Sequence, residues 1–302
     1  SAQQRQHVPV MLTQVLDGLR VRPDGRYLDG TFGRGGHARE LLKRLDSAGR
    51  LLVMDRDPEA IASAQGEFAM DARVRIRQAN FADIAQWPEA QAGLDGVLLD
   101  LGVSSPQLDD PARGFSFQNE GPLDMRMDPT RGLSAAQWLA AADATEIADV
   151  LWRYGEERMS RRIASAIVER RAEHPLATTR DLSGLVAATI TARMGKSRER
   201  HKHPATRTFQ AVRIHVNDEL GALQQGLAGA ATCLVAGGRL AVLSFHSLED
   251  RAVKHFIRGE VVHAVRRGPP RAAAALAPLR AIGKAQFADA AEVAANPRAR
   301  SA

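Results

Sequence analysis

The stretch LDGTFGRGGHA at residues 28–38 decides the fold, because an apolar strand end runs directly into a loop with four glycines. The residues that follow, ELLKRL at 40–45, continue a helical pattern that begins at the end of the loop. Gly33, Gly35 and Ala38 fit the G-x-G-x-x-G/A spacing of loops that hold a dinucleotide between a strand and a helix. The stretch therefore predicts a strand, a ligand-binding turn and a helix.

Short apolar runs alternate with helical patterns around this stretch. The runs are RYLD, RLLVMD, RVRIRQ, LDGVLLDL and GRLAVLSF, at 26–29, 50–55, 73–78, 94–101 and 238–245. Strands separated by helix-length segments are typical of βαβ units. In the second helix, Asp57 is expected to be the N-cap and Pro58 the first helical residue. The sequence predicts an α/β fold built on a doubly wound, Rossmann-like parallel sheet.

The alternation stops after residue 108. A loop rich in glycine, proline and aspartate leads into segments with helical spacing and no strand signal. These segments are TEIADVLWRYG, RMSRRIASAIVERR, TTRDLSGLVAATI and TFQAVRIHVNDELGALQQGL, at 145–155, 158–171, 178–190 and 208–227. Thr145 is expected to cap the first of these helices and Gly155 to end it. We expect an all-helical domain at 109–205, inserted into a discontinuous domain at 1–108 and 206–302.

Composition narrows the class of protein. The chain has 302 residues, 44% of them apolar, and a formal net charge of +6, which is compatible with a nucleic-acid partner. Cys233 is the only cysteine, so the sequence excludes an internal disulfide and a cysteine-based zinc site; we expect it to fill the core. We see no secretion signal, membrane span or metal-ligand cluster, and expect a cytoplasmic protein without a metal.

Two acidic residues bear on the ligand of the glycine loop. Asp29 ends the first strand, and Asp55 ends the second about twenty residues beyond the loop, where a carboxylate accepts ribose hydroxyls. NAD is one interpretation. Asp29, however, would repel a pyrophosphate and attract a cation, which favours S-adenosylmethionine (SAM) with its ammonium and sulfonium groups. The third interpretation is an ordinary turn that needs glycine for a positive φ.

The fourth strand ends in LLDLGVSSPQLDD, with polar residues that should border the same crevice. Asp100, Ser104 and Ser105 are candidates to accept the hydrogens of an exocyclic amine, a poor nucleophile that needs acceptors and in-line placement. A Ser-Pro turn that merely closes the strand explains each serine equally well. Gln107 completes the set of polar residues.

Long motifs across the chain resemble the bacterial family of ribosomal small-subunit RNA methyltransferase H, also called MraW. From His7 to Ala302 they are HVPVMLTQVLDGL, DGTFGRGGHA, DRDPEAI, LLDLGVSSPQLDDPARGFSF, GPLDMRMDP, YGEERMSRRIASAI, HPATRTFQAVRIHVNDEL, GGRLAVLSFHSLEDRAVKHF and NPRARSA. The resemblance implies a class I SAM-dependent methyltransferase domain at 1–108 and 206–302, with 109–205 as a substrate-recognition insertion. It implies methylation of N4 of a 2′-O-modified cytidine in 16S rRNA, in the part of the decoding centre that faces the P-site.

The resemblance also implies site residues. The family's SAM contacts fall here on Gly35, Gly36, His37, Asp55, Phe81, Asp100 and Gln107. Phe81 is where adenine stacking is expected; Asp29 and Gly33 join the set from the loop argument above. In the family, NPRARSA continues into a last apolar, basic strand, so two interpretations stay open: an incomplete antiparallel edge of the sheet, or a sequence that is shortened at its C-terminus. SAM binding, at the other strands, should not depend on the choice.

A basic run follows the helical segments. It consists of Arg193, Lys196, Arg198, Arg200, Lys202, Arg207 and Arg213. We expect contact with rRNA phosphates, the alternative being a solvated face. His246, after the fifth strand, is either a general base or a structural hydrogen-bonding group. The loop GPLDMRMDP at 121–129 is either a lid over the cofactor or an ordered turn.

The predicted chemistry is direct, in-line methyl transfer from SAM to a cytosine swung out of its stack, with 16S rRNA or the small ribosomal subunit as partner, no membrane and no metal. A nicotinamide oxidoreductase and a non-catalytic RNA-binding protein remain as alternatives. The oligomeric state is not fixed by the sequence, and a dimer is compatible with it.

Overall fold

The computed structural model describes residues 9–194, 203–259 and 279–302. The chain divides into two compact units, one formed by Ser1–Gly102 with Leu220–Ala302 and the other by Val103–Glu219. We call them the sheet unit and the helical unit and describe each by itself. In the part of the chain that the structure describes, no helix combines the length and the apolar character that crossing a membrane requires.

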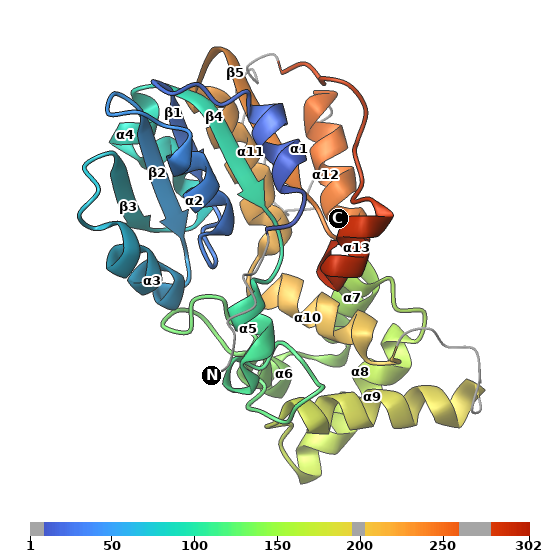
Figure 1. The fold of residues 1–302 in the computed structure, drawn as a ribbon. Helices are drawn as coiled ribbons and strands as arrows, with labels where there is room; N and C mark the ends of the chain where they lie inside the picture. The colour runs from blue at the N-terminus through green and yellow to red at the C-terminus, as the bar shows by residue number, and fades with distance from the viewer. Residues whose placement is uncertain (1–8, 195–202, 260–278) are drawn as a thin grey trace, which may run out of the picture. The chain divides into compact units, whose positions relative to one another are not determined.

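The sheet unit is built on five parallel strands in the order β3-β2-β1-β4-β5 (Figure 1). The strands are β1 (Arg26–Asp29), β2 (Arg50–Asp55), β3 (Val74–Gln78), β4 (Leu94–Asp100) and β5 (Leu234–Leu243). The first three strands are added in one direction from β1, and β4 and β5 are added on its other side. The ends of β1 and β4 therefore form the switch point at which α/β sheets of this kind bind ligands. The predicted α/β fold is confirmed. Strand β5 begins four residues before the predicted run because it continues through Gly237, whose φ is +79°.

Helices cover both faces of this sheet. The elements are α1 (Leu12–Leu19), α2 (Gly36–Lys43), α3 (Pro58–Phe68), η1 (Phe81–Gln86), α4 (Pro88–Gln91), α11 (Glu219–Cys233), α12 (Ser247–Ile257), α13 (Ala290–Ala295) and η3 (Pro297–Ser301). Alternate residues of β2 enter different cores, Leu51 and Val53 with α1–α3, and Leu52 and Met54 with α4 and α11. Cys233 lies in the second core, as predicted. Such alternation is what a sheet buried on both faces requires.

The ends of the helices follow local capping chemistry. Asp57 caps α3 by accepting a hydrogen bond from Glu59 N, and Pro58 is the first helical residue, as predicted. The predicted cap at Thr145 is wrong. Asp143 caps this helix instead by accepting from Glu146 N at 2.8 Å, because a carboxylate three residues ahead of that amide reaches it directly.

The helical unit has one apolar core. Its elements are α5 (Ser105–Asp109), η2 (Pro111–Arg113), α6 (Ala135–Ala141), α7 (Ala144–Gly155), α8 (Ser160–Glu173), α9 (Thr179–Met194) and α10 (Thr206–Val216). Phe209 and Val212 of α10 belong to that core, and Leu108 packs against it. The units therefore divide after Gly102 and Glu219, whereas the sequence suggested divisions after 108 and 205.

The segment at 208–227, predicted as one helix, is two. Helix α10 ends at Val216 and α11 begins at Glu219, with Asp218 at a φ of +46° between them. Asn217 uses its side chain on another segment: its Oδ1 accepts from Met127 N at 2.8 Å, and its Nδ2 donates to Met125 O at 2.7 Å. The apolar spacing continues across the break, so the periodicity could not reveal it.

Candidate active site

The carboxyl ends of β1, β2 and β4 bring three aspartates to one edge of the sheet. Asp29, Asp55 and Asp100 are the last residues of these neighbouring strands. Asp29 is only 1% exposed. Its Oδ1 accepts from Thr31 N at 3.0 Å, while its Oδ2 is buried without a hydrogen-bond partner. A buried carboxylate oxygen with no donor is costly unless a ligand supplies one.

Asp55 holds the glycine loop. Its Oδ2 accepts from Gly33 N at 2.8 Å and its Oδ1 from Asp57 N at 2.9 Å. Gly35 has a φ of +74°, and a Cβ on it would lie 2.5 Å from Phe32 Cζ. This turn therefore excludes a side chain at Gly35 both by backbone conformation and by space, before α2 begins at Gly36.

Asp100 and His37 approach each other across this edge. The distance from His37 Nδ1 to Asp100 Oδ2 is 3.6 Å, and His37 Nε2 lies 2.9 Å from Val10 O. Because a carbonyl can only accept, the second contact assigns the proton to Nε2. Thr31, which the sequence argument passed over, connects two of the aspartates: its N donates to Asp29 and its Oγ1 accepts from Asp100 N at 2.7 Å.

All three carboxyl groups hold protons more tightly than usual. Burial raises the pKa of Asp29 to about 7, and the charge of Asp55 adds to the effect. Burial likewise raises the pKa of Asp55 to about 6. For Asp100, burial and then the charges of Asp29 and Glu249 raise the pKa to about 8. Three acids with raised pKa values at one edge favour a positively charged ligand and oppose a pyrophosphate.

Phe81 lies at the start of η1, three residues after the last residue of β3. A helix of the sheet unit approaches it closely, since a Cβ added to Gly226 of α11 would lie 2.4 Å from Phe81 Cδ2. Another close approach is at Gly30, whose added Cβ would lie 3.2 Å from Phe81 Cβ. Gly226 thus leaves room for α11 against the ring of Phe81, and Gly30 leaves room for the loop after β1 against its Cβ. Gly226 carried no signal in the sequence.

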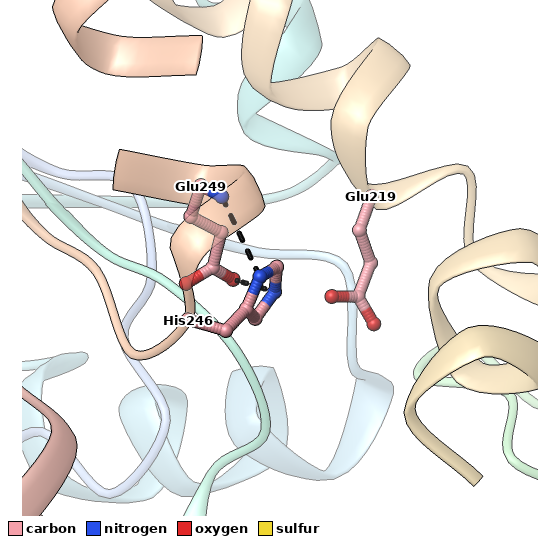
Figure 2. A group of neighbouring side chains, drawn as sticks. All are labelled: Glu219, His246 and Glu249. Atoms are coloured by element: carbon pink, nitrogen blue, oxygen red, sulfur yellow. Dashed lines mark hydrogen bonds and ion pairs between the residues drawn. The ribbon is translucent and has the colours of Figure 1, made fainter. Parts of the chain in front are cut away.

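His246 caps α12 and pairs with Glu249 (Figure 2). His246 Nε2 lies 3.0 Å from Glu249 Oε1, a contact of ion-pair length without the alignment of a hydrogen bond. Glu249 is 2% exposed, and its Oε2 accepts from Phe245 N at 2.8 Å. The sequence analysis did not single out Glu249, although an acidic residue three positions into a helix is a known capping pattern. The general-base role of His246 stays a prediction.

Three predicted polar residues belong to the helical unit. Ser104 caps α5: Ser104 N donates to Gln107 Oε1 at 3.0 Å, and Gln107 N donates to Ser104 Oγ at 3.4 Å. Ser105 and Gln107 are buried. This reciprocal capping is the structural role that the sequence analysis weighed for the Ser-Pro turn. The catalytic roles of both serines and the cofactor role of Gln107 stay predictions.

Most of the predicted RNA-binding run lies outside the part of the chain that the structure describes. Lys196, Arg198, Arg200, Lys202 and the side chain of Arg193 lie outside the described residues. Arg207 is exposed and donates to Glu156 O at 3.1 Å. Arg213 is mostly buried and pairs with Glu219, at 2.8 Å from Nε to Oε1 and 3.0 Å from Nη2 to Oε2. The guanidinium of Arg213 is therefore already engaged by a carboxylate.

The loop at 121–129 is an ordered turn within the helical unit. Met125 and Met127 are buried in its core. Arg126 donates from Nε and Nη2 to the two carboxylate oxygens of Asp124, at 2.9 and 2.7 Å. With the hydrogen bonds from Asn217 described above, these contacts fix the turn from both sides.

Comparison with known proteins decides the family. Residues 4–302 match the model of the MraW methylase family. The chain belongs to this family. It is 58% identical over 297 residues to a protein of Stenotrophomonas maltophilia, covering 98% of this chain and 91% of the relative. Relatives from Xanthomonas euvesicatoria and Xylella fastidiosa are 59% and 58% identical; each match covers 98% of this chain, and 86% and 95% of the relative. All three are named ribosomal RNA small subunit methyltransferase H. The resemblance read from the motifs is confirmed.

Proposed function

We propose that this MraW family member transfers a methyl group from SAM to the N4 amino group of a cytidine in 16S rRNA, in the P-site region of the decoding centre. The rRNA substrate is supported by the names of the relatives, which cover nearly the whole chain. The choice of N4 rests on the family resemblance and on the need of an exocyclic amine for acceptors such as Asp100.

The environment of Asp29 is the main support for SAM as the cofactor. Its Oδ2 is buried and lacks a partner, and its pKa is raised to about 7 mainly by burial. A cationic ligand would satisfy this oxygen and stabilise the ionised carboxylates around it. SAM has an ammonium and a sulfonium to offer at such a site, whereas NAD brings a pyrophosphate.

The cofactor would be held by residues of the strand ends and the glycine loop. The set is Asp29, Gly33, Gly35, Gly36, His37, Asp55, Phe81 and Asp100, with Gln107 included from the family resemblance. SAM, when bound, supplies a methyl group on a sulfonium that is already an activated leaving group. Asp55 would accept the ribose hydroxyls, and Phe81 would stack on the adenine.

Asp100 would accept a hydrogen of the cytosine amine. The ionised carboxylate is the stronger acceptor, and without a ligand burial and neighbouring acids keep the pKa of Asp100 at about 8. A positive charge bound beside Asp29 would offset those acids and lower the pKa of Asp100. The same event that fills the cofactor site thus prepares the acceptor for substrate.

The helical unit would recognise the RNA, and the protein would act in the cytoplasm on rRNA or on the small subunit. An insertion of this size is a common way to add substrate specificity to a shared catalytic fold. The net charge of +6 suits a polyanionic partner.

Two measurements test the proposal. Calorimetric titration should give binding of SAM and none of NAD; the reverse would indicate a nicotinamide enzyme. Incorporation of labelled methyl groups into naked 16S rRNA and into 30S particles, followed by nuclease digestion and mass analysis, should give N4-methylated cytidine. Binding of both SAM and RNA without methyl transfer to either substrate would identify a non-catalytic RNA-binding protein.

A further inference from the structure

Arg158, in the turn between α7 and α8, and Arg161 and Arg162, in the first turn of α8, have no side-chain partner among the described residues. Arg158, Arg161 and Arg162 are all exposed. None of them makes an ion pair or a side-chain hydrogen bond with any residue in 9–194, 203–259 or 279–302. Several other arginines of the helical unit are engaged, for example Arg126 by Asp124 and Arg171 by two carbonyls at the end of α6.

These arginines outnumber the acidic residues of the same turn, because only Glu156 has an exposed carboxylate there. Glu157 is buried, and its Oε1 accepts from Met159 N at 3.0 Å, so its carboxylate faces inward. Glu156 is exposed, and its backbone carbonyl accepts from Arg207 at 3.1 Å. Arg207 comes from α10, which adds a fourth exposed guanidinium to the turn. Positive charge is therefore in excess at this corner.

An exposed indole lies near the end of α7, six residues before Arg158. Trp152 of α7 is 58% exposed, although a side chain of its size is usually well covered. Its carbonyl accepts from Glu156 N at 3.0 Å, so Trp152 borders the same turn. Its indole nitrogen has no hydrogen-bond partner among the described residues. Figure 1 shows α7 leading into α8 in the green part of the chain.

We infer that this corner, formed by Trp152, Arg158, Arg161, Arg162 and Arg207, binds single-stranded RNA. Guanidinium groups bind phosphates in a geometry that lysine cannot match, and an exposed indole offers a face on which an unpaired base stacks. Several exposed cations, with an exposed aromatic side chain on the preceding helix, suit a single-stranded polyanion better than an apolar protein partner. The inference deepens the proposed function, on which it rests for the class of substrate.

The arginines are tested through the salt dependence of RNA binding. The variant Arg158→Ala/Arg161→Ala/Arg162→Ala is titrated with a fluorescent single-stranded RNA of about twelve nucleotides, a length within the usual site sizes. If three phosphate contacts are lost, the slope of log affinity against log salt should flatten by about 2, and affinity near 0.1 M salt should fall about ten- to a hundredfold.

A matched control removes the same charge elsewhere. Arg44, Arg131 and Arg258 are also exposed and without side-chain partners among the described residues, so their combined replacement by alanine lowers the net charge equally. The control should change the slope by much less. An equal change of slope in both triple variants would overturn the inference, because it would show that only the net charge of the protein matters and not the position of the arginines.

The tryptophan is tested by stacking. Trp152→Ala should weaken single-stranded RNA binding by about 5- to 160-fold, in line with about 1–3 kcal/mol per stacked base, while Trp152→Phe should keep most of the affinity. Binding of a duplex of the same length should respond to the arginine variant and hardly to Trp152→Ala. An unchanged affinity of Trp152→Ala for the single strand would also overturn the inference.

The proposed function is checked separately with the unaltered protein. If the unaltered protein methylates rRNA while the arginine variant binds RNA normally, the proposed function stands and the inference about this corner is wrong. If it binds RNA through this corner but transfers no methyl group, the proposed reaction is wrong. Normal RNA binding by the arginine variant, together with loss of binding to a ribosomal protein, would instead assign the corner to a protein partner.

Discussion

Asp55 connects the glycine loop to the neighbouring strand, since its two carboxylate oxygens accept from Gly33 N and Asp57 N. We expect Asp55→Ala to weaken SAM binding strongly, because each charge-assisted hydrogen bond to a ribose hydroxyl contributes about 1.5–3 kcal/mol. Calorimetric titration measures the loss, and thermal unfolding of the same variant checks that it still folds. A dissociation constant equal to that of the unaltered protein would contradict the ribose assignment.

A substitution at Asp100 can separate an effect on the methyl-transfer step from an effect on cofactor binding. Asp100→Asn keeps the size of the side chain but weakens the acceptor and turns an amide donor toward the cytosine amine. We expect methyl transfer to slow by roughly thirty- to a thousandfold, corresponding to about 2–4 kcal/mol, while SAM affinity falls less. Single-turnover methylation at saturating SAM and RNA measures this. A near-normal rate would move the catalytic role to Ser104, Ser105 or His246.

At the scale of single residues, the sequence revealed the carboxylates but not their partners. Asp29, Asp55 and Asp100 could be predicted because each ends an apolar strand, and strand ends meet at one edge of a parallel sheet. The links through Thr31 and Glu249 depend on side-chain directions in the folded chain. No spacing rule supplies those directions.

Helix α11 limits where the ring of Phe81 can lie. A Cβ on Gly226 would meet Phe81 at 2.4 Å, so Gly226→Ala must push the ring or the helix aside. We expect the free energy of unfolding to fall by about 1–3 kcal/mol and SAM affinity to weaken, because the displaced ring no longer stacks on the adenine. Chemical denaturation and calorimetric titration measure the two effects.

Gly66 offers a matched control for this prediction. It lies within α3, and a Cβ on it would meet nothing within 4 Å. Gly66→Ala should raise the free energy of unfolding by about 0.5–1 kcal/mol through helix propensity alone and leave SAM binding unchanged. If both glycine variants bind SAM equally well, Phe81 is not a cofactor contact.

At the scale of elements, the spacing of apolar residues predicted which segments form helices better than it predicted where those helices begin and end. The repeating apolar positions of α7, α8 and α9 correspond to helices of the structure. The break at Asn217 and Asp218 escaped detection because the apolar positions on both sides stay in phase. It exists because Asn217 bonds to the distant backbone of Met125 and Met127, a tertiary contact that overrides local helix propensity.

At the scale of the whole molecule, the acidic edge of the sheet makes stability depend on pH and ligand together. Burial raises the pKa of Asp29 to about 7, well above the value of about 3.9 expected in the unfolded chain. The folded protein therefore binds this proton more tightly than the unfolded chain does. The contribution of Asp29 to stability is full below about pH 4 and is lost as the pH rises through about 7.

This dependence predicts opposite effects of Asp29→Asn on the free and the SAM-bound protein. An amide resembles the protonated acid, so at pH 7.5 the ligand-free variant should unfold a few degrees higher than the unaltered protein, whereas below about pH 4, where Asp29 is largely protonated in both states, the two should nearly coincide. The stabilisation by SAM should shrink in the variant, because the oxygen that receives the cation has been replaced. Thermal unfolding at both pH values, with and without SAM, measures all four quantities. A variant that is destabilised equally at both pH values would mean that Asp29 is needed for folding and not for the ligand. The predicted pattern would instead mean that the unpartnered oxygen of Asp29 lowers the stability of the free protein and serves cofactor binding.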